Sequence, residues 1–221
     1  MPTQVQLVEG AWSDQPCYVI GGGPSLRAFD WSRLKTRTRV IVINRAFLDV
    51  PTADIWFSED ARVITELWGS KLREFKGTKV WHAIEKGAVE DVKAVDPSIR
   101  IIEQKRTDKH WSRRFSDGLS YSSNSGVGAI NIAWLLGADP IHLLGFDCRT
   151  EGLRMQNYHN DYKHDPMWEV GSNAADNFKS DLEGWVQPHT KDTQIINVIN
   201  PAYPSALTCW KTMPYEEFYK L

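Results

Sequence analysis

Cysteines are scarce in this 221-residue chain, which has only three and no Cys-x-x-Cys pair. An odd, unpaired set argues against a disulfide framework, a zinc site and an oxidising compartment. Cys17 falls in an apolar run typical of a core strand, so we expect it to be a buried free thiol. No apolar run approaches the ~18 residues that a membrane span needs, and the first residues lack the pattern of a signal peptide. We therefore expect a soluble cytoplasmic protein.

The chain also lacks an excess of charge of either sign. Its 26 Lys and Arg residues nearly balance 28 Asp and Glu residues, and the formal net charge is −2. This balance excludes a broad electrostatic attraction to nucleic acid or to an anionic membrane. Neither a repeat, a low-complexity tract nor a clear linker divides the sequence. We expect residues 1–221 to form one domain, since this length is enough for a single large core.

Short apolar runs alternate with helical patterns along the chain. We predict strands at 17–20, 40–43, 54–57, 79–82, 100–103, 141–145 and 194–198, and helices at 26–34, 61–75 and 125–136. This alternation is typical of an α/β, Rossmann-like domain with a mainly parallel sheet and helices on both faces. Two long segments, 104–123 and 148–173, interrupt the pattern. We expect them to be long loops, one of them lid-like.

The most informative segment is 17–26, where an apolar run ends in three glycines, Pro24 and Ser25. Glycines let backbone N–H groups approach an anion closely, and proline suits the first turn of a helix whose N-terminus attracts phosphate. The segment therefore predicts a phosphate-binding turn, and a ligand-free tight turn is the alternative. It is neither a dinucleotide fingerprint nor a P-loop, because Leu26 replaces the third glycine and no Gly-Lys-Ser/Thr follows.

Small, polar or acidic residues follow nearly every predicted strand. In sheets of this kind ligands bind beyond the carboxyl ends of the strands, so we expect these residues to form one nucleotide-binding site. The set comprises Gly21, Gly22, Gly23, Pro24, Ser25, Asn44, Ser58, Asn124, Ser125, Gly126, Phe146 and Asp147. If the protein uses a metal, Asp147 with Asp60 or Glu59 would be natural ligands, since Mg²⁺ prefers oxygen.

The order of these motifs resembles a known superfamily. A Gly-x-Gly-Pro-Ser-Leu turn, a strand closed by Asn44, an Asn-Ser-Gly helix start and a Leu-Gly-Phe-Asp147 strand end follow one another. They are similar to those of the Campylobacter-type α-2,3-sialyltransferases and the MptE-like 6-hydroxymethylpterin diphosphokinases, a group with relatives in phage genomes. The resemblance covers about residues 16–60 and 120–205. If this chain is phage-encoded, it would act in the host cytoplasm.

The resemblance implies roles for several residues. Gly21–Ser25 would lie at the nucleotide phosphates, Asn44 near the transferred group, Asn124–Gly126 at the nucleotide sugar and base, and Phe146–Asp147 beside the ribose. This chain departs from the sialyltransferases at two positions: Gly22 replaces an asparagine, and Gly171 stands where their histidine base would be.

The segment 148–173 supplies other candidates for catalysis. Its His159 and His164 could each act as a base, because an imidazole takes up a proton near neutral pH. Its Tyr158 and Tyr162 could bind a leaving phosphate.

We predict a transferase that uses a nucleotide-activated donor. The leading hypothesis is a glycosyltransferase that moves a sugar from a nucleotide sugar to a hydroxyl of a small molecule, a glycan or a modified base, with no cofactor required. One alternative is a diphosphokinase that transfers pyrophosphate from ATP with Mg²⁺. The sequence leaves the oligomeric state open.

A further alternative is a non-catalytic protein that binds a nucleotide, or one associated with nucleic-acid modification. The basic segment around Lys105 and Arg113 also contains Trp111 and Phe115, which together offer charge for phosphates and rings for stacking on bases. A solvated loop balanced by its own acidic residues is the simpler interpretation of this segment.

Overall fold

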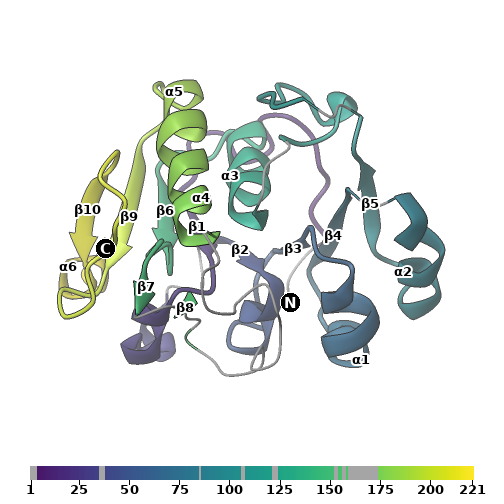
Figure 1. Ribbon diagram of the computed structural model, residues 1–221, viewed down its shortest axis with the longest axis horizontal. Coiled ribbons are helices and arrows are strands. Elements are labelled where there is room, and N and C mark those ends of the chain that lie inside the picture. The colour runs from purple at the N-terminus through teal and green to yellow at the C-terminus, as the bar shows by residue number, and fades with distance from the viewer. Residues whose placement is uncertain are drawn as a thin grey trace.

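The computed structural model describes residues 4–34, 38–84, 86–105, 108–120, 124–151, 154–155, 158 and 174–221. Within them an eight-stranded sheet is built from β1 (Cys17–Ile20), β2 (Arg39–Ile43), β3 (Ile55–Ser58), β4 (Thr78–Ala83), β5 (Arg100–Glu103), β6 (Ile141–Leu144), β9 (Ile195–Ile199) and β10 (Lys211–Pro214). A short antiparallel pair, β7 (Thr150–Glu151) and β8 (Arg154–Met155), lies outside it (Figure 1).

The helical segments complete the α/β alternation. They are η1 (Pro24–Ala28), η2 (Trp31–Arg33), η3 (Asn44–Leu48), η4 (Val63–Trp68), α1 (Gly69–Leu72), η5 (Lys86–Ala88), α2 (Val89–Val95), η6 (Phe115–Asp117), α3 (Ser125–Leu135), α4 (Ala174–Asp181), η8 (Leu182–Val186), α5 (Gln187–His189) and α6 (Tyr215–Phe218).

The sheet is parallel throughout, in the order β10-β9-β6-β1-β2-β3-β4-β5. Strand β1 is central, and Cys17 lies opposite Arg39 on one side and Ile141 on the other. From β1 the chain first builds outward through β2 to β5, and then builds the other half through β6, β9 and β10. The point where the direction of building reverses lies between β1 and β6. The predicted α/β class is confirmed.

Two apolar layers cover the faces of the sheet. Alternate strand residues such as Val19, Ile41 and Leu143 belong to one layer, which includes α3 and η8. Their neighbours along the strands, such as Ile20 and Val42, belong to the other layer, with η1, η4, α1, α2 and α6. Both faces are therefore buried, as the continuous apolar strands predicted. Cys17 is fully buried and has a free thiol, also as predicted.

Helix α3 can lie directly on the sheet because its residues are small. A Cβ atom added to Gly128 would lie 2.6 Å from the Phe57 ring of β3, so only glycine fits there. One polar side chain of α3, Asn131, is fully buried. Its amide donates to the carbonyl of Ser112 at 2.9 Å and accepts from the N–H of Ser120 at 3.0 Å. These bonds hold the chain that follows β5 against the helix.

Two predicted helices differ in the structure. The helix expected at 26–34 is two short 3-10 segments, η1 and η2, because Phe29 is extended and Asp30 caps η2 by accepting from the N–H of Ser32 at 3.1 Å. The helix expected at 61–75 begins as the π-helical segment η4 and continues as α1. The sequence analysis missed β10 and α6, and it predicted no helix at α2, α4, η8 or α5.

The alternative of a stacking surface at 104–123 is wrong for its tryptophan. Trp111 is only 7% exposed and packs edge-on against Trp134 and in a stacked arrangement on His189, with ring centroids 5.7 and 5.8 Å away. Its ring is therefore part of the core and is not available to a base. In the described part of the chain, no helix combines the length and apolar character that a membrane crossing requires.

Histidine 142 makes the stability of the fold dependent on pH. It is buried in β6 against Tyr18 and Phe218, and burial lowers its pKa to about 4. Below its ordinary pKa of ~6.5 the unfolded chain takes up a proton that the folded chain refuses. The free energy of unfolding should therefore fall from about pH 6.5 to about pH 4, by roughly 2–3 kcal/mol.

The variant His142→Leu should flatten this slope, as measured by urea unfolding at a series of pH values. An equal slope in the variant and the parent protein would assign the effect to other groups.

Candidate functional site

The glycine turn lies at the point where the direction of building reverses, directly after β1. Ligands of open parallel sheets bind at such a switch point, beyond the carboxyl ends of the strands. The turn faces the segment that follows β6: the N–H of Gly21 donates to the carbonyl of Leu144 at 2.8 Å, and that of Gly23 to the carbonyl of Gly145 at 2.9 Å. The topology thus brings the turn and residues 145–147 into contact at the switch point, where a ligand of such a sheet would bind.

The glycines serve this contact. A Cβ atom on Gly23 would overlap the Asp147 carboxylate and lie 2.6 Å from the carbonyl oxygen of Gly145, and one on Gly21 would lie 3.3 Å from the Phe146 ring. The expectation that the N–H groups of the turn are open to an anion is wrong for Gly21, Gly23 and Ser25, because the chain itself uses them. The assignment of the turn to a phosphate stays a prediction.

Asp147 supplies the anion at the start of η1. Its carboxylate accepts from the N–H of Ser25 at 2.8 Å and is 3% exposed. Burial raises the pKa of this carboxyl group, while the hydrogen bond from Ser25 acts in the opposite direction. The loop between β9 and β10 also contacts Asp147, since the N–H of Ala206 donates to its carbonyl at 2.8 Å.

Tyr215, in the first turn of α6, is a neighbour that the sequence analysis missed. Its hydroxyl and that of Ser25 are neighbours, and both are buried. Burial raises the pKa of Tyr215 well above its ordinary value, and the nearby Asp147 charge adds to this effect. No sequence signal points to Tyr215, because it is brought here by a strand that was not predicted.

Asn44 closes β2 in a strained conformation. Its φ of +51° lies in the left-handed region, which asparagine tolerates better than most residues. Its side-chain oxygen accepts from the hydroxyl of Ser58 at 2.8 Å, and its carbonyl accepts from the indole N–H of Trp56 at 2.7 Å. Asn44 and Ser58, predicted to share a site, are therefore in direct contact at neighbouring strand ends.

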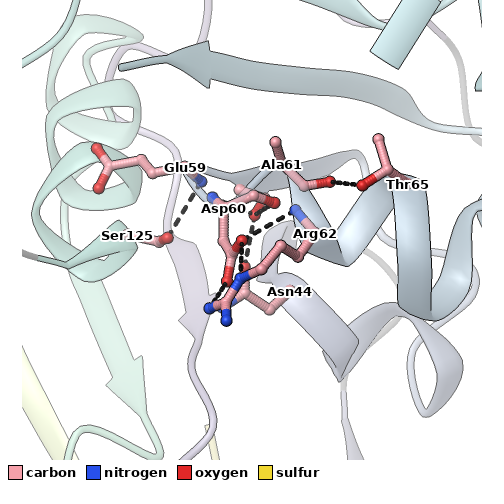
Figure 2. A network of polar contacts seen from close by, with 8 residues as sticks. Asn44, Glu59, Asp60, Ala61, Arg62, Thr65 and Ser125 are labelled. Atoms are coloured by element: carbon pink, nitrogen blue, oxygen red, sulfur yellow. Dashed lines mark hydrogen bonds and ion pairs between the residues drawn. The ribbon is translucent and has the colours of Figure 1, made fainter. Parts of the chain in front are cut away.

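The two acidic residues after β3 point in different directions (Figure 2). Asp60 forms an ion pair with Arg62 at 2.7 Å. Glu59 extends towards α3, and its carboxylate lies 3.0 Å from the imidazole of His82, whose side chain is fully buried. Burial raises the pKa of Glu59, and the bond with His82 opposes this.

These partners decide how well a metal would fit. The three carboxylates proposed as ligands, of Asp60, Glu59 and Asp147, are held by Arg62, His82 and Ser25 respectively. In the described ranges no three His, Cys, Asp or Glu side chains are grouped as a metal centre would need. The residues described here do not fit a Mg²⁺ site, so we assign no step of a reaction to a metal.

The N-terminus of α3 approaches the same place. Asn124 caps the helix by accepting from the N–H of Val127 at 3.2 Å. The hydroxyl of Ser125 accepts from the backbone N–H of Glu59 at 3.2 Å, which joins the helix to the end of β3 (Figure 2). A Cβ atom on Gly126 would lie 2.9 Å from the Phe146 ring. The Phe146 ring therefore touches both the glycine turn and the helix start.

Tyr158 is the one proposed catalytic residue that the structure describes. Its N–H donates to the carbonyl of Gly22 at 3.0 Å, and its hydroxyl donates to the Asp49 carboxylate at 2.6 Å. Arg45 donates to the same hydroxyl at 3.3 Å. This places Tyr158 over the glycine turn. His159, Tyr162 and His164 lie outside the described residues, so their roles stay predictions.

Comparisons with known proteins agree with the fold. No family model and no curated protein matches the chain. Among solved structures it is similar to the sialyltransferase CST-II in complex with a trisaccharide acceptor and CMP, at 14% identity over 90% of this chain and 88% of that one, with a TM-score of 0.51. It is also similar to the MAf glycosyltransferase from Magnetospirillum magneticum AMB-1, at 14% identity over 94% of this chain and 34% of that one, with a TM-score of 0.56.

At such identities the likeness shows the fold alone. The α/β architecture expected from the alternation of strands and helices is thus shared with solved glycosyltransferases. Membership of the MptE-like group and a phage origin stay predictions.

The contact between the turn and residues 145–147 can be tested by adding one methyl group. Gly23→Ala should lower the free energy of unfolding by about 1–3 kcal/mol, because backbone and carboxylate atoms already occupy the space of the new Cβ. The matched control is Gly184→Ala in η8, where a Cβ would meet nothing within 4 Å.

The control should be neutral or should stabilise the helix by up to about 1 kcal/mol. Chemical denaturation measures both variants. Equal stability of Gly23→Ala and the parent protein would show that the turn is not packed as described.

Proposed function

We propose that the protein is a transferase that binds a nucleotide sugar at the switch point and moves the sugar to a hydroxyl acceptor. The observation that carries the proposal is the meeting of three segments around Phe146: the glycine turn, the strand end at Asp147 and the start of α3. The likeness in fold to CST-II, whose structure contains CMP and a trisaccharide acceptor, supports this choice of substrate class.

The charges of the site suggest how such a donor would lie. A carboxylate only accepts hydrogen bonds and repels phosphate, so we place the ribose hydroxyls beside Asp147. The eleven-residue helix α3 carries partial positive charge at its N-terminus, which favours an anion. We therefore place the donor phosphates between Gly22 and Ser125, on the side of the turn away from Asp147.

The proposed reaction is a displacement at the sugar carbon that carries the nucleotide. A histidine of the segment 148–173, His159 or His164, takes the proton of the acceptor hydroxyl. The acceptor oxygen forms the new bond to that carbon. The bond from that carbon to the phosphate oxygen breaks, and the nucleotide leaves with its electron pair. Asn44, held by Ser58, would orient the transferred group.

A panel of nucleotides tests binding. In thermal unfolding with CMP, UDP, GDP, ADP and ATP, at least one ligand at 100 times its Kd should add about 2.7 kcal/mol to the free energy of unfolding. EDTA should leave this shift unchanged, since no metal is assigned to the site. Absence of a shift with every nucleotide would contradict the proposed binding, and a shift lost in EDTA would contradict the metal-free reaction.

Substitution of the two histidines tests the base. His159→Ala and His164→Ala should both keep the thermal shift with the nucleotide, and one of them should lower turnover by at least about 100-fold, because general base catalysis contributes on this scale. The measurement is release of nucleotide from the donor in the presence of acceptor. Full turnover in both variants would contradict the assignment of the general base to this segment.

A further inference from the structure

A hollow lies at the opposite end of α3 from the candidate site. It has a volume of about 460 Å³ and is lined by Lys105, His110, Trp111, Arg113, Asp117 and two serines of the segment 105–117. Its tryptophan packs against Trp134, in the last turn of α3. The candidate site begins at Ser125, nine residues before Trp134, and at 1.5 Å per residue the helix separates the two places by about 14 Å.

The surroundings of the hollow confirm this location. Trp111 also stacks on His189, which ends α5 just before β9 begins. The segment therefore lies towards the amino ends of the strands. Figure 1 shows it crossing the same end of α3 that α5 lies beside. The hollow is separate from the site proposed for the nucleotide sugar.

Two ring nitrogens of the hollow lack partners. The indole nitrogen of Trp111 and Nε2 of His110 are buried and make no hydrogen bond to any described residue. The indole N–H can only donate. The other imidazole nitrogen, Nδ1, lies 3.1 Å from the carbonyl of Asp108 and must carry the proton there, so Nε2 is the acceptor of this tautomer and the indole N–H is the unpartnered donor. A buried donor without an acceptor costs about 1–3 kcal/mol, which an incoming acceptor would recover.

The hollow also carries an excess of positive charge. Lys105 and Arg113 line it together with a single acidic residue, Asp117. The ammonium group of Lys105 donates one of its three N–H groups to the carbonyl of Ser116. The Arg113 side chain is exposed, and its guanidinium group presents five N–H donors in a planar fork that matches two oxygens of one anion.

We propose that this hollow binds the phosphate group of a small phosphorylated ligand. A phosphate offers oxygens to the Arg113 guanidinium, the Lys105 ammonium and the unpartnered indole N–H of Trp111, and it balances the excess charge. The volume lies within the range of small-molecule pockets and exceeds what phosphate alone would fill. A nucleic acid is disfavoured because stacking needs an open aromatic face, whereas the Trp111 ring is buried between other rings.

The test uses the full chain, inorganic phosphate as the probe and the indole N–H resonance of Trp111 as the local readout. Trp111→Phe identifies that resonance in a ¹⁵N–¹H spectrum. Phosphate should shift it in a saturable way, whereas sodium chloride at the same ionic strength should not. Arg113→Ala and Lys105→Ala should each weaken binding by at least about tenfold, the effect of losing a charged hydrogen bond.

The matched control is the neighbouring arginine. Arg114 is exposed but does not line the hollow, so Arg114→Ala should leave the affinity for phosphate within about twofold. An unmoved Trp111 resonance, or equal weakening by Arg113→Ala and Arg114→Ala, would overturn the proposal. Tighter binding of a single-stranded oligonucleotide than of pyrophosphate would overturn it in favour of a nucleic-acid surface.

These outcomes are independent of the proposed transferase activity, because the experiment contains no nucleotide and the resonance reports on the far end of α3.

Discussion

The close approach of the glycine turn to residues 145–147 is the contact on which the rest of the site depends. Two backbone hydrogen bonds and the bond from Ser25 to Asp147 join the ends of β1 and β6. They can form only because Gly23 has no side chain. This junction fixes the Phe146 ring, and the ring in turn sets the distance between the turn and the start of α3. A close backbone contact, rather than an open cradle for an anion, is the immediate reason for the glycines.

The strands of the sheet and their alternation with helices could be predicted because strands that are buried on both faces are continuously apolar. The small residues of α3 likewise indicated that this helix packs closely on the sheet. The same reasoning located Asn44, Ser58 and Asp147 at strand ends. Prediction from the sequence failed where the environment of a residue depends on residues far away in the chain. The N–H of Ser25 donates to Asp147, which lies 122 positions away in the sequence. Tyr215 directly follows β10, a strand whose apolar pattern is too weak to predict. The basic residues around Trp111 suggested an exposed ring, yet Trp134 and His189 pack against this ring.

Two adjacent acidic residues show how tertiary contacts give similar side chains different partners. Glu59 and Asp60 follow one strand end, and the sequence offers both as metal ligands. After β3 ends, Glu59 is directed inward to His82, whereas Asp60 pairs with Arg62. Neither carboxylate is then directed at Asp147. Helix α3 has a similar division along its length, because its first turn contributes to the proposed donor site and its last turn supports the basic hollow.

The hydrogen bond from Trp56 to Asn44 has a spectroscopic consequence. Trp56 is fully buried, and its indole proton is bonded to the backbone carbonyl of Asn44, a candidate-site residue with a positive φ. The chemical shift of that proton depends on the length of the bond, so it would record any movement of Asn44 without an added label. The indole proton of Trp111, without an acceptor in the described chain, would resonate in a different environment. A single spectrum of the tryptophan side chains would therefore observe both ends of α3 together.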